Sequence, residues 1–235
     1  MRFTPIKLID VAGLVPGAHL GKGLGNQFLD DLRQADVLIH VLDVSGRTNE
    51  NGEAVSGYDP EQDIMFLEEE VNLWFAGVIK KNLGKILGKL RHGGDFIKEL
   101  SQNLAGLGIK EDEIKKSLKD AGLEGKTDLS DDDVSAFAIE LRKNSLPIVL
   151  AANKIDLDSA GNFEKLKEKY DLTPICAEGE LALREADHAG IIKYTPGSGN
   201  FALVDEPNPK QKAGLEFLKK NILEKYGDTG VQKVL

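Results

Sequence analysis

Two short runs of apolar residues constrain the fold of this chain more than any other feature of its sequence. Residues 37–43 read Val-Leu-Ile-His-Val-Leu-Asp, and residues 147–152 read Pro-Ile-Val-Leu-Ala-Ala. Both runs are apolar at successive positions, which is typical of strands buried on both faces of a parallel sheet. Between and beyond them, apolar residues recur at spacings of three and four, as in amphipathic helices. The pattern predicts an α/β fold with a mostly parallel sheet.

The composition is that of an ordinary globular protein. The 235 residues are 41% apolar and 29% charged, enough for one sizeable core or for a core with a smaller helical module. No run approaches the roughly 18 apolar residues that cross a membrane, and no charged-then-apolar leader is present, so we expect a cytoplasmic protein without a membrane partner. The single cysteine, Cys176, excludes an internal disulfide and a multi-cysteine zinc site. The net charge of −9 disfavours a protein that binds nucleic acid over its whole surface. A local basic face that binds nucleic acid is still compatible with this charge.

Residues 59–145 are expected to form a helical insertion between two strands. Asp59 and Pro60 open a long helix as N-cap and first-turn residue, and its apolar stripe runs from Ile64 to Ile79. This stripe is either plain core packing, which is the simpler interpretation, or a site for an external partner. Three more helical stretches follow, at residues 96–104, 109–121 and 130–141. The predicted domains are therefore 1–58, 59–145 and 146–235, with the helical domain inserted into the α/β domain.

An aspartate and a glycine follow the apolar run Ile6-Lys7-Leu8-Ile9 near the start of the chain. We expect residues 1–13 to form a buried strand and its exit loop, with Asp10 and Gly13 where open α/β sheets bind nucleotides. In a nucleotide-hydrolysing switch protein the aspartate holds Mg²⁺, usually through water, and the glycine N–H contacts the terminal phosphate. The tetrapeptide Asp-x-x-Gly also occurs in ordinary turns, so it carries little weight alone. Spaced glycines and a short amphipathic helix over residues 26–36 follow it.

The segment after the second apolar run has the residues that guanine recognition needs. Residues 153–156 read Asn-Lys-Ile-Asp. The Asp156 carboxylate can accept hydrogen bonds from N1–H and the 2-amino group of guanine, the Asn153 amide can read the opposite edge, and the Lys154 stem can pack along the base. Adenine lacks both donors, so its binding would leave a desolvated carboxylate unpaired. The alternative is a solvated turn, but the position directly after an apolar strand favours guanine.

The remaining segments complete the predicted α/β domain. A helix over residues 163–170 and a short strand over residues 172–175 lead into Cys176-Ala177-Glu178, and a last amphipathic helix begins at Pro209. Cys176 either opens a loop that contacts the base or is a buried apolar filler. No general base lies beside it in sequence, so we do not expect a nucleophile.

These motifs together resemble those of the Obg-related GTPases, and most closely the YchF branch found in archaea. The resemblance rests on Asp10-Val11-Ala12-Gly13, on the glycines spaced along residues 17–25, and on Asn153-Lys154-Ile155-Asp156. It implies a P-loop NTPase-type sheet with an inserted helical domain, and it makes the glycine-rich stretch a switch segment that responds to the γ-phosphate. Bacterial and eukaryotic YchF relatives typically carry a glutamate-ending variant and prefer ATP, so the aspartate kept here predicts GTP.

The resemblance also implies an activity and its site residues. The family hydrolyses GTP to GDP and phosphate with magnesium and is linked to translation, so a ribosome or ribosomal RNA is the implied partner. Asp10 becomes the metal ligand, and Asp10 and Gly13 join the nucleotide site. Backbone N–H groups at Cys176, Ala177 and Glu178 are implied to contact the guanine oxygen.

His40 is the candidate catalytic residue that the resemblance suggests. A histidine near the nucleotide has been proposed in the YchF family to assist hydrolysis, and His40 is the one polar interruption of its apolar run. The alternative is a core histidine whose ring nitrogens are satisfied by a neighbouring backbone group.

No Gly-x-x-x-x-Gly-Lys-Ser/Thr segment occurs in the 235 residues, although that loop cradles the α- and β-phosphates in P-loop proteins. The resemblance implies that the P-loop and the first strand lie upstream of Met1 and that a TGS domain follows the last helix. We therefore expect a fragment with an incomplete sheet that hydrolyses GTP poorly on its own. The alternative is a short, non-hydrolysing helical interaction module derived from a GTPase.

Overall fold

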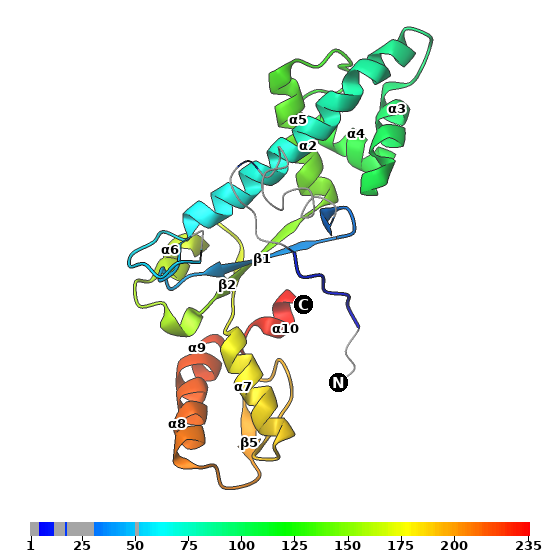
Figure 1. Ribbon diagram of the computed structural model, residues 1–235. Helices are drawn as coiled ribbons and strands as arrows, with labels where there is room; N and C mark the ends of the chain where they lie inside the picture. The colour runs from blue at the N-terminus through cyan, green and yellow to red at the C-terminus, as the bar shows by residue number, and fades with distance from the viewer. Residues whose placement is uncertain (1–4, 12–16, 18–30, 50–51) are drawn as a thin grey trace. The chain divides into compact units, whose positions relative to one another are not determined.

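Figure 1 shows the computed structural model of the chain, which describes residues 5–11, 17, 31–49 and 52–235. The chain forms two compact units. The helical unit comprises Met1–Leu38 and Met65–Ile148, and the sheet unit comprises Ile39–Ile64 and Val149–Leu235. No helix in the described ranges combines the length and the apolar composition that crossing a membrane requires.

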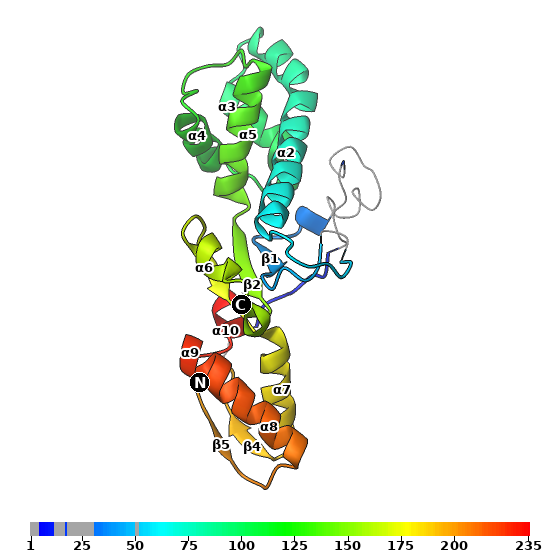
Figure 2. The ribbon, with the colours of Figure 1, turned by 90° about the vertical axis from the view of Figure 1, so that its left-hand side faces the viewer.

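The helical unit is built mainly from four helices: α2 (Glu61–Leu90, of which the part from Met65 belongs here), α3 (Phe96–Leu104), α4 (Glu111–Asp120) and α5 (Asp131–Ser145). A 3₁₀ turn, Ala105–Leu107, follows α3. The three shorter helices lie beside the second half of α2 (Figure 2). Each helix contributes fully buried side chains to one core, among them Ile79, Ile86, Leu100, Ile114 and Phe137. Much of the apolar stripe of α2 is therefore used for packing inside the chain.

Side-chain caps mark the starts of α2 and α5. The Asp59 carboxylate accepts a hydrogen bond from the Glu61 N–H at 3.0 Å. Ser130 and Asp133 form a reciprocal capping box, in which the Ser130 hydroxyl accepts from the Asp133 N–H at 3.2 Å and the Asp133 carboxylate accepts from the Ser130 N–H at 2.7 Å. Such bonds satisfy first-turn N–H groups that have no acceptor within the helix. The helix starts expected near Asp59 and Ser130 are thus confirmed.

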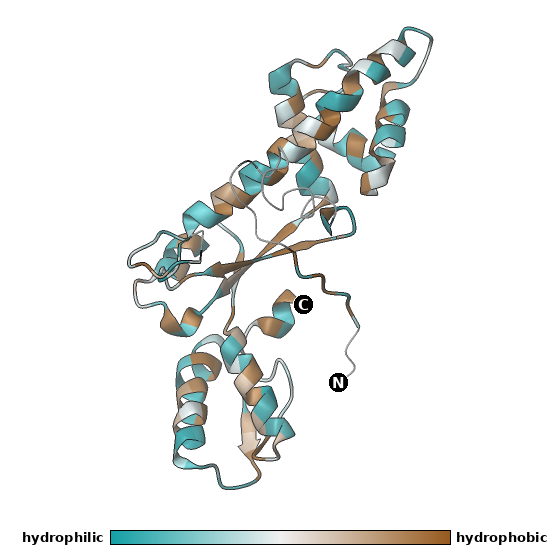
Figure 3. Ribbon diagram, viewed as in Figure 1, coloured by the Kyte–Doolittle hydropathy of each residue, from teal (hydrophilic) through white to brown (hydrophobic). Residues whose placement is uncertain are grey.

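The sheet has the strand order β1 (Leu38–Asp43), β2 (Ile148–Asn153), β3 (Leu172–Pro174). β2 and β3 pair in parallel, with Leu150 opposite Leu172. β1 and β2 also run in the same direction, because the Leu38 N–H donates to the Pro147 carbonyl at their start and the Val44 N–H donates to the Asn153 carbonyl at their end. Both strands are strongly apolar (Figure 3). The predicted α/β class with a mostly parallel sheet is confirmed.

The expectation that residues 37–43 are buried on both faces is wrong. Leu38 and Leu42 are buried on one face of β1, whereas Val41 on the other face is 56% exposed. Among the described strands, β1 has a neighbour on one side only, so it lies at the edge of this sheet.

The predicted N-terminal strand is also not observed. Residues 5–11 have no regular secondary structure, and the side chains of Ile6 and Leu8 are 49% and 63% exposed. A strand requires a neighbour for its backbone hydrogen bonds, and no described strand pairs with this segment. The helix expected over residues 26–36 is described only from residue 31, and it ends at Leu32, where the chain turns.

The rest of the sheet unit contains α6 (Asn162–Lys167), α7 (Ala177–His188) and a hairpin of β4 (Ile192–Tyr194) with β5 (Phe201–Leu203). The last helix runs through α8 (Pro209–Leu218), a π-helical turn (Lys219–Leu223) and α9 (Glu224–Tyr226), and a short α10 (Val231–Val234) follows. The helix start at Pro209 is confirmed, with Asn208 as N-cap. α6 ends three residues before the expected Tyr170, and the sequence did not predict the short hairpin.

Candidate functional site

Two loops at the carboxyl end of the sheet hold most of the predicted base-recognition residues. β2 ends at Asn153, and Lys154 leads into a 3₁₀ turn, Ile155–Leu157, that carries Asp156. β3 ends at Pro174, and Cys176 directly precedes α7, whose first turn carries Ala177 and Glu178. The loops contact each other, since the Ile155 N–H donates to the Ile175 carbonyl at 3.3 Å. Parallel pairing of β2 with β3 therefore brings the predicted residues to one edge of the sheet.

The Asn153 side chain is oriented by the neighbouring loop. Its Oδ1 accepts a hydrogen bond from the Ala177 N–H at 3.2 Å. Its carbonyl oxygen accepts from the Val44 N–H at 3.1 Å. Within the described ranges no acceptor contacts the Asn153 Nδ2, so this amide presents a free donor. A donor at this position suits the acceptor edge of a purine.

Lys154 is held by an aspartate that the sequence analysis did not single out. The Lys154 Nζ lies 2.6 Å from Oδ2 of Asp43, the last residue of β1. Asp43 also accepts hydrogen bonds from the Ser45 N–H at 3.0 Å and from the Thr48 hydroxyl at 2.6 Å. Burial alone would raise the pKa of Asp43, but the bonds from Lys154, Ser45 and Thr48 outweigh it and lower the pKa to about 2. The available signal was an aspartate directly after an apolar strand, the same signal that selected Asp10.

Cys176 connects the two loops through its thiol. The Cys176 Sγ donates a hydrogen bond to Oδ1 of Asp156 at 3.3 Å, and its backbone N–H donates to the Thr229 carbonyl at 2.9 Å. Burial, with a further contribution from the Asp156 charge, raises the pKa of this thiol to about 12. The thiol therefore stays protonated at neutral pH and acts as a hydrogen-bond donor, which does not suit a nucleophile.

The backbone N–H groups of this loop differ in their availability. Those of Cys176 and Ala177 already donate to Thr229 and Asn153. The Glu178 N–H lies in the first turn of α7 and meets no acceptor in the part of the chain that the structure describes. Of the three expected donors to a base oxygen, Glu178 is thus the one left free, at a helix N-terminus that favours negative charge.

Comparison with known proteins identifies the family. Residues 151–235 match the family model described as Obg-like GTPase YGR210-like, G4 motif-containing domain, and residues 2–71 match the model described as 50S ribosome-binding GTPase. Over its whole length the chain is 42% identical to an uncharacterized GTP-binding protein of Methanocaldococcus jannaschii, of which it covers 60%. The chain belongs to the Obg-like GTPases.

Two further matches agree with this assignment. The crystal structure of a GTP-binding protein from Pyrococcus horikoshii has a TM-score of 0.72 and 34% identity, over 88% of this chain and 57% of that one. The ribosome-binding ATPase YchF of Escherichia coli O157:H7 is 29% identical over 98% of this chain and 62% of its own length. The Obg-like chain therefore spans about 60% of the length of these relatives.

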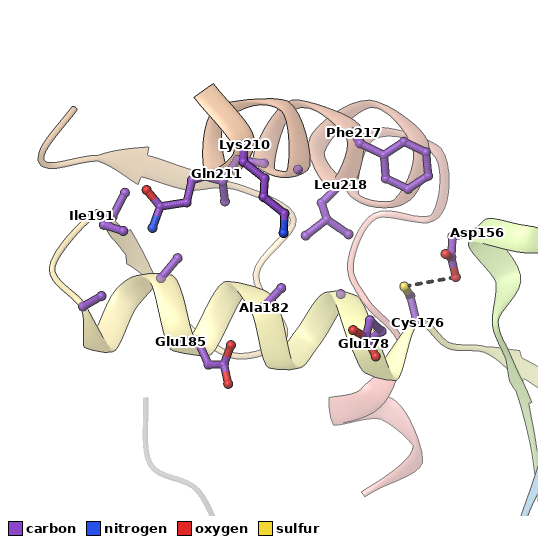
Figure 4. A pocket seen from close by; sticks show the side chains of 15 residues that line it. Asp156, Cys176, Glu178, Ala182, Glu185, Ile191, Lys210, Gln211, Phe217 and Leu218 are labelled. Carbon is purple, nitrogen blue, oxygen red and sulfur yellow. Dashed lines mark hydrogen bonds between the residues drawn. The ribbon is translucent and has the colours of Figure 1, made fainter. Parts of the chain in front are cut away.

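A cavity adjoins the predicted base-recognition loops of this Obg-like chain. It has a volume of about 760 Å³ and lies between α7 and α8, with Asp156, Cys176 and Glu178 at one end (Figure 4). Its walls are mostly small or apolar, and Glu185, Lys210 and Gln211 add polar groups. The Asp156 carboxylate thus faces a concave surface, as a ligand-binding residue requires.

The other predicted site residues do not belong to these two loops. Asp10 belongs to the helical unit, where its side chain is exposed and has no hydrogen-bond or ion-pair partner within the described ranges. Gly13 lies outside the described residues. Further along the chain, the Gly17 N–H donates to Oε1 of Glu70 on α2 at 2.9 Å. No group of three or more histidine, cysteine, aspartate or glutamate side chains that could hold a metal occurs among the described residues.

His40 lies on β1 and is not satisfied by a backbone group. Its Nδ1 atom is buried, and no partner contacts it in the described part of the structure. Burial lowers the pKa of His40 from 6.5 to about 4, so the ring is neutral at pH 7. The alternative of a core histidine with a satisfied ring is therefore not what the structure shows.

Proposed function

We propose that the chain binds GTP and GDP through the loops that follow β2 and β3. In this proposal Asp156 accepts hydrogen bonds from N1–H and the 2-amino group of guanine, and the free Nδ2 of Asn153 donates to the opposite edge. The Glu178 N–H meets the guanine oxygen, and the stem of Lys154 packs along the ring. The observation that carries the proposal is the hydrogen bond from Cys176 to Oδ1 of Asp156, which holds this carboxylate beside the loop that carries the free Glu178 N–H.

Selectivity for guanine follows from the cost of an unpaired carboxylate. A guanine base would pair the Asp156 oxygens with two N–H donors, whereas adenine offers none at those positions. A buried acceptor without a donor costs about 1–3 kcal/mol, and more when it is charged. A preference of guanine over adenine by several orders of magnitude is therefore expected, as in other sites built to hydrogen-bond one substrate.

For the phosphates, we propose that Asp10 and Gly13 contribute to nucleotide binding, with Asp10 as the metal ligand, and that His40 assists hydrolysis. Mg²⁺ is commonly bound through one or two carboxylates together with the substrate phosphates, and the exposed, unpartnered Asp10 is a donor of this class. The bound ion would supply charge neutralisation at the β- and γ-phosphates. His40, neutral at pH 7, has a nitrogen able to accept a proton. The reaction is GTP hydrolysis to GDP and phosphate, which the chain alone would perform poorly because its 235 residues contain no phosphate-cradling Gly-Lys loop.

The descriptions of one matched family model and of the YchF relative both contain the term ribosome-binding. This supports a ribosome or ribosomal RNA as the partner of the present chain. We further propose that residues 59–145 act as a helical domain inserted between two parts of a G domain, residues 1–58 and 146–235. The caps at Asp59 and Ser130 and the shared core of α2 to α5 support this division.

The substitution Asp156→Asn tests the base assignment. An asparagine amide in place of the carboxylate pairs better with xanthine, which has a carbonyl where guanine has its amino group, so preference is expected to move from GDP to xanthosine diphosphate by at least about tenfold. Fluorescent nucleotide titration measures both affinities. Asp171→Asn, the same change at an exposed position before β3, is the matched control. Unchanged guanine selectivity in the Asp156 variant would refute the proposed base site.

A further inference from the structure

A turn near the C-terminal end of the chain lies directly against the base-recognition loop. Besides the bond from the Cys176 N–H to the Thr229 carbonyl, Gly230 adopts φ +76° and approaches Pro174 so closely that a Cβ atom would lie 1.9 Å from the Pro174 carbonyl oxygen. Only glycine fits such an approach. The side chain of Thr229 is buried, with 1% exposure for the residue. The turn formed by residues 228–230 is therefore packed closely against the end of β3.

Glu180 on α7 holds this turn through a buried carboxylate. The residue is 4% exposed, and its Oε2 accepts hydrogen bonds from the Thr229 hydroxyl at 2.6 Å and from the Tyr194 hydroxyl at 2.8 Å. Its Oε1 accepts from Nε of Arg184 at 2.6 Å. A buried carboxylate is costly unless such donors surround it, and removing one donor leaves it under-satisfied. The Glu180 carboxylate thus connects α7, β4 and the 228–230 turn through hydrogen bonds.

We propose that Thr229 and Glu180 are positioning residues that set the orientation of Asp156 toward guanine. The contacts form a continuous series: Glu180 fixes the Thr229 hydroxyl, the Thr229 carbonyl fixes the Cys176 N–H, and the Cys176 thiol donates to Oδ1 of Asp156. Within the described residues no donor contacts Oδ2 of Asp156, so this oxygen stays available to the base. The inference rests on the proposed guanine site and adds the element that orients it.

A positioning role and a purely structural role predict different nucleotide preferences. Inosine diphosphate keeps the N1–H of guanine but lacks the 2-amino group, so the ratio of GDP to inosine diphosphate affinity reports how well Asp156 meets both donors. Simple loss of folded protein lowers both affinities equally and leaves the ratio unchanged. A rotated Asp156 lowers the ratio itself.

The test compares Thr229→Val with Thr229→Ser in the full chain. Valine keeps the shape and removes the hydroxyl, and the ratio is expected to fall by about tenfold, the value of roughly one hydrogen bond. Serine keeps the hydroxyl, and the ratio is expected to stay within about twofold of the unmodified protein. Thr195→Val places the same change at an exposed threonine and is the matched control, with no change in ratio expected. Glu180→Gln, which keeps the shape and removes the charge, is a second variant expected to lower the ratio.

The possible outcomes separate this inference from the proposed function. If the unmodified protein shows no preference for GDP over inosine diphosphate, the guanine site and its positioning both fail. If it shows the preference, and folded Thr229→Val and Glu180→Gln proteins keep the full ratio, the positioning role alone is overturned. A reduced ratio in these variants, with recovery in Thr229→Ser, supports it.

Discussion

Lys154 has an unusual backbone conformation in the loop that is proposed to recognise the base. It has φ +60° and is the one non-glycine residue with a positive φ in the described ranges. A side chain in the left-handed region costs of order 1 kcal/mol, so the surrounding contacts must hold it there. The ion pair of its side chain with Asp43 and the bond from the next residue's N–H, that of Ile155, to the Ile175 carbonyl do so. On either side of Lys154 in the sequence, the Nδ2 atom of Asn153 and the Oδ2 atom of Asp156 have no partner within the described ranges.

His40 gives a prediction at the same scale. Its pKa is lowered by burial from 6.5 to about 4, so between these pH values the unfolded chain binds a proton that the folded chain does not. The stability contribution of the neutral ring is full above about pH 6.5 and is lost as the pH falls through about 4. The free energy of unfolding is expected to decrease by roughly 2–3 kcal/mol over this interval. Urea denaturation at a series of pH values measures it.

The control for this prediction is His40→Gln, which cannot be protonated. The variant should lose the part of the pH dependence that lies between about pH 6.5 and 4. The same slope in both proteins would show that other groups cause it and that His40 is not the buried, unpartnered ring described above.

At the residue scale, the sequence singled out the side chains proposed to read a base but not the residues that hold them. Asn153, Lys154 and Asp156 follow an apolar strand with a recognisable spacing, so their shared loop could be predicted. Asp43 is 111 positions from its partner Lys154, and Thr229 is 49 positions from Glu180. No local pattern links such pairs. Only the folded backbone brings these supporting residues to the site.

The capping box of α5 gives a prediction at the scale of one element. Ser130→Ala removes the side-chain acceptor for the Asp133 N–H and is expected to lower the free energy of unfolding by about 1 kcal/mol. Ser135→Ala is the matched control, because the Ser135 hydroxyl bonds back to the Asp131 carbonyl inside the helix and alanine is the better helix former. Thermal unfolding followed by circular dichroism measures both. Equal loss in the two variants would contradict the capping role.

Among the elements, long helices were predicted best and isolated strands worst. The periodicity of α2 to α5 extends over two or more turns, and polar caps mark the starts of α2 and α5, so these helices could be placed from the sequence. Residues 6–9 look like a buried strand but remain irregular, because strand formation depends on a pairing partner and not on local pattern. β4 and β5 have three residues each, too few to show an alternation. Val41 is exposed because its face of β1 is largely uncovered, whereas Leu38 and Leu42 on the opposite face are buried.

At the scale of the whole molecule, the two units differ in what they contribute to the proposed function. The helical unit has a continuous apolar core contributed by four helices. The base-recognition loops, the cavity and the 228–230 turn all belong to the sheet unit. A ligand stabilises only the conformations that bind it, by RT ln(1 + [L]/Kd), or about 2.7 kcal/mol at a hundredfold excess over Kd. Stabilisation by a guanine nucleotide should therefore be concentrated in the sheet unit.

Hydrogen–deuterium exchange with and without GDP tests this distribution. Saturating GDP is expected to slow amide exchange in residues 153–157, 176–180 and 228–230, because the base contacts one loop and the Thr229 and Gly230 contacts hold the other two segments against it. Exchange in α3, α4 and α5 should change little, since their hydrogen bonds open with the separate helical core. ADP at the same concentration is the control and should protect neither region. Equal protection of α3 to α5 by GDP would show that both units open together and would contradict this division, whereas protection absent from residues 228–230 would argue against the turn as part of the base site.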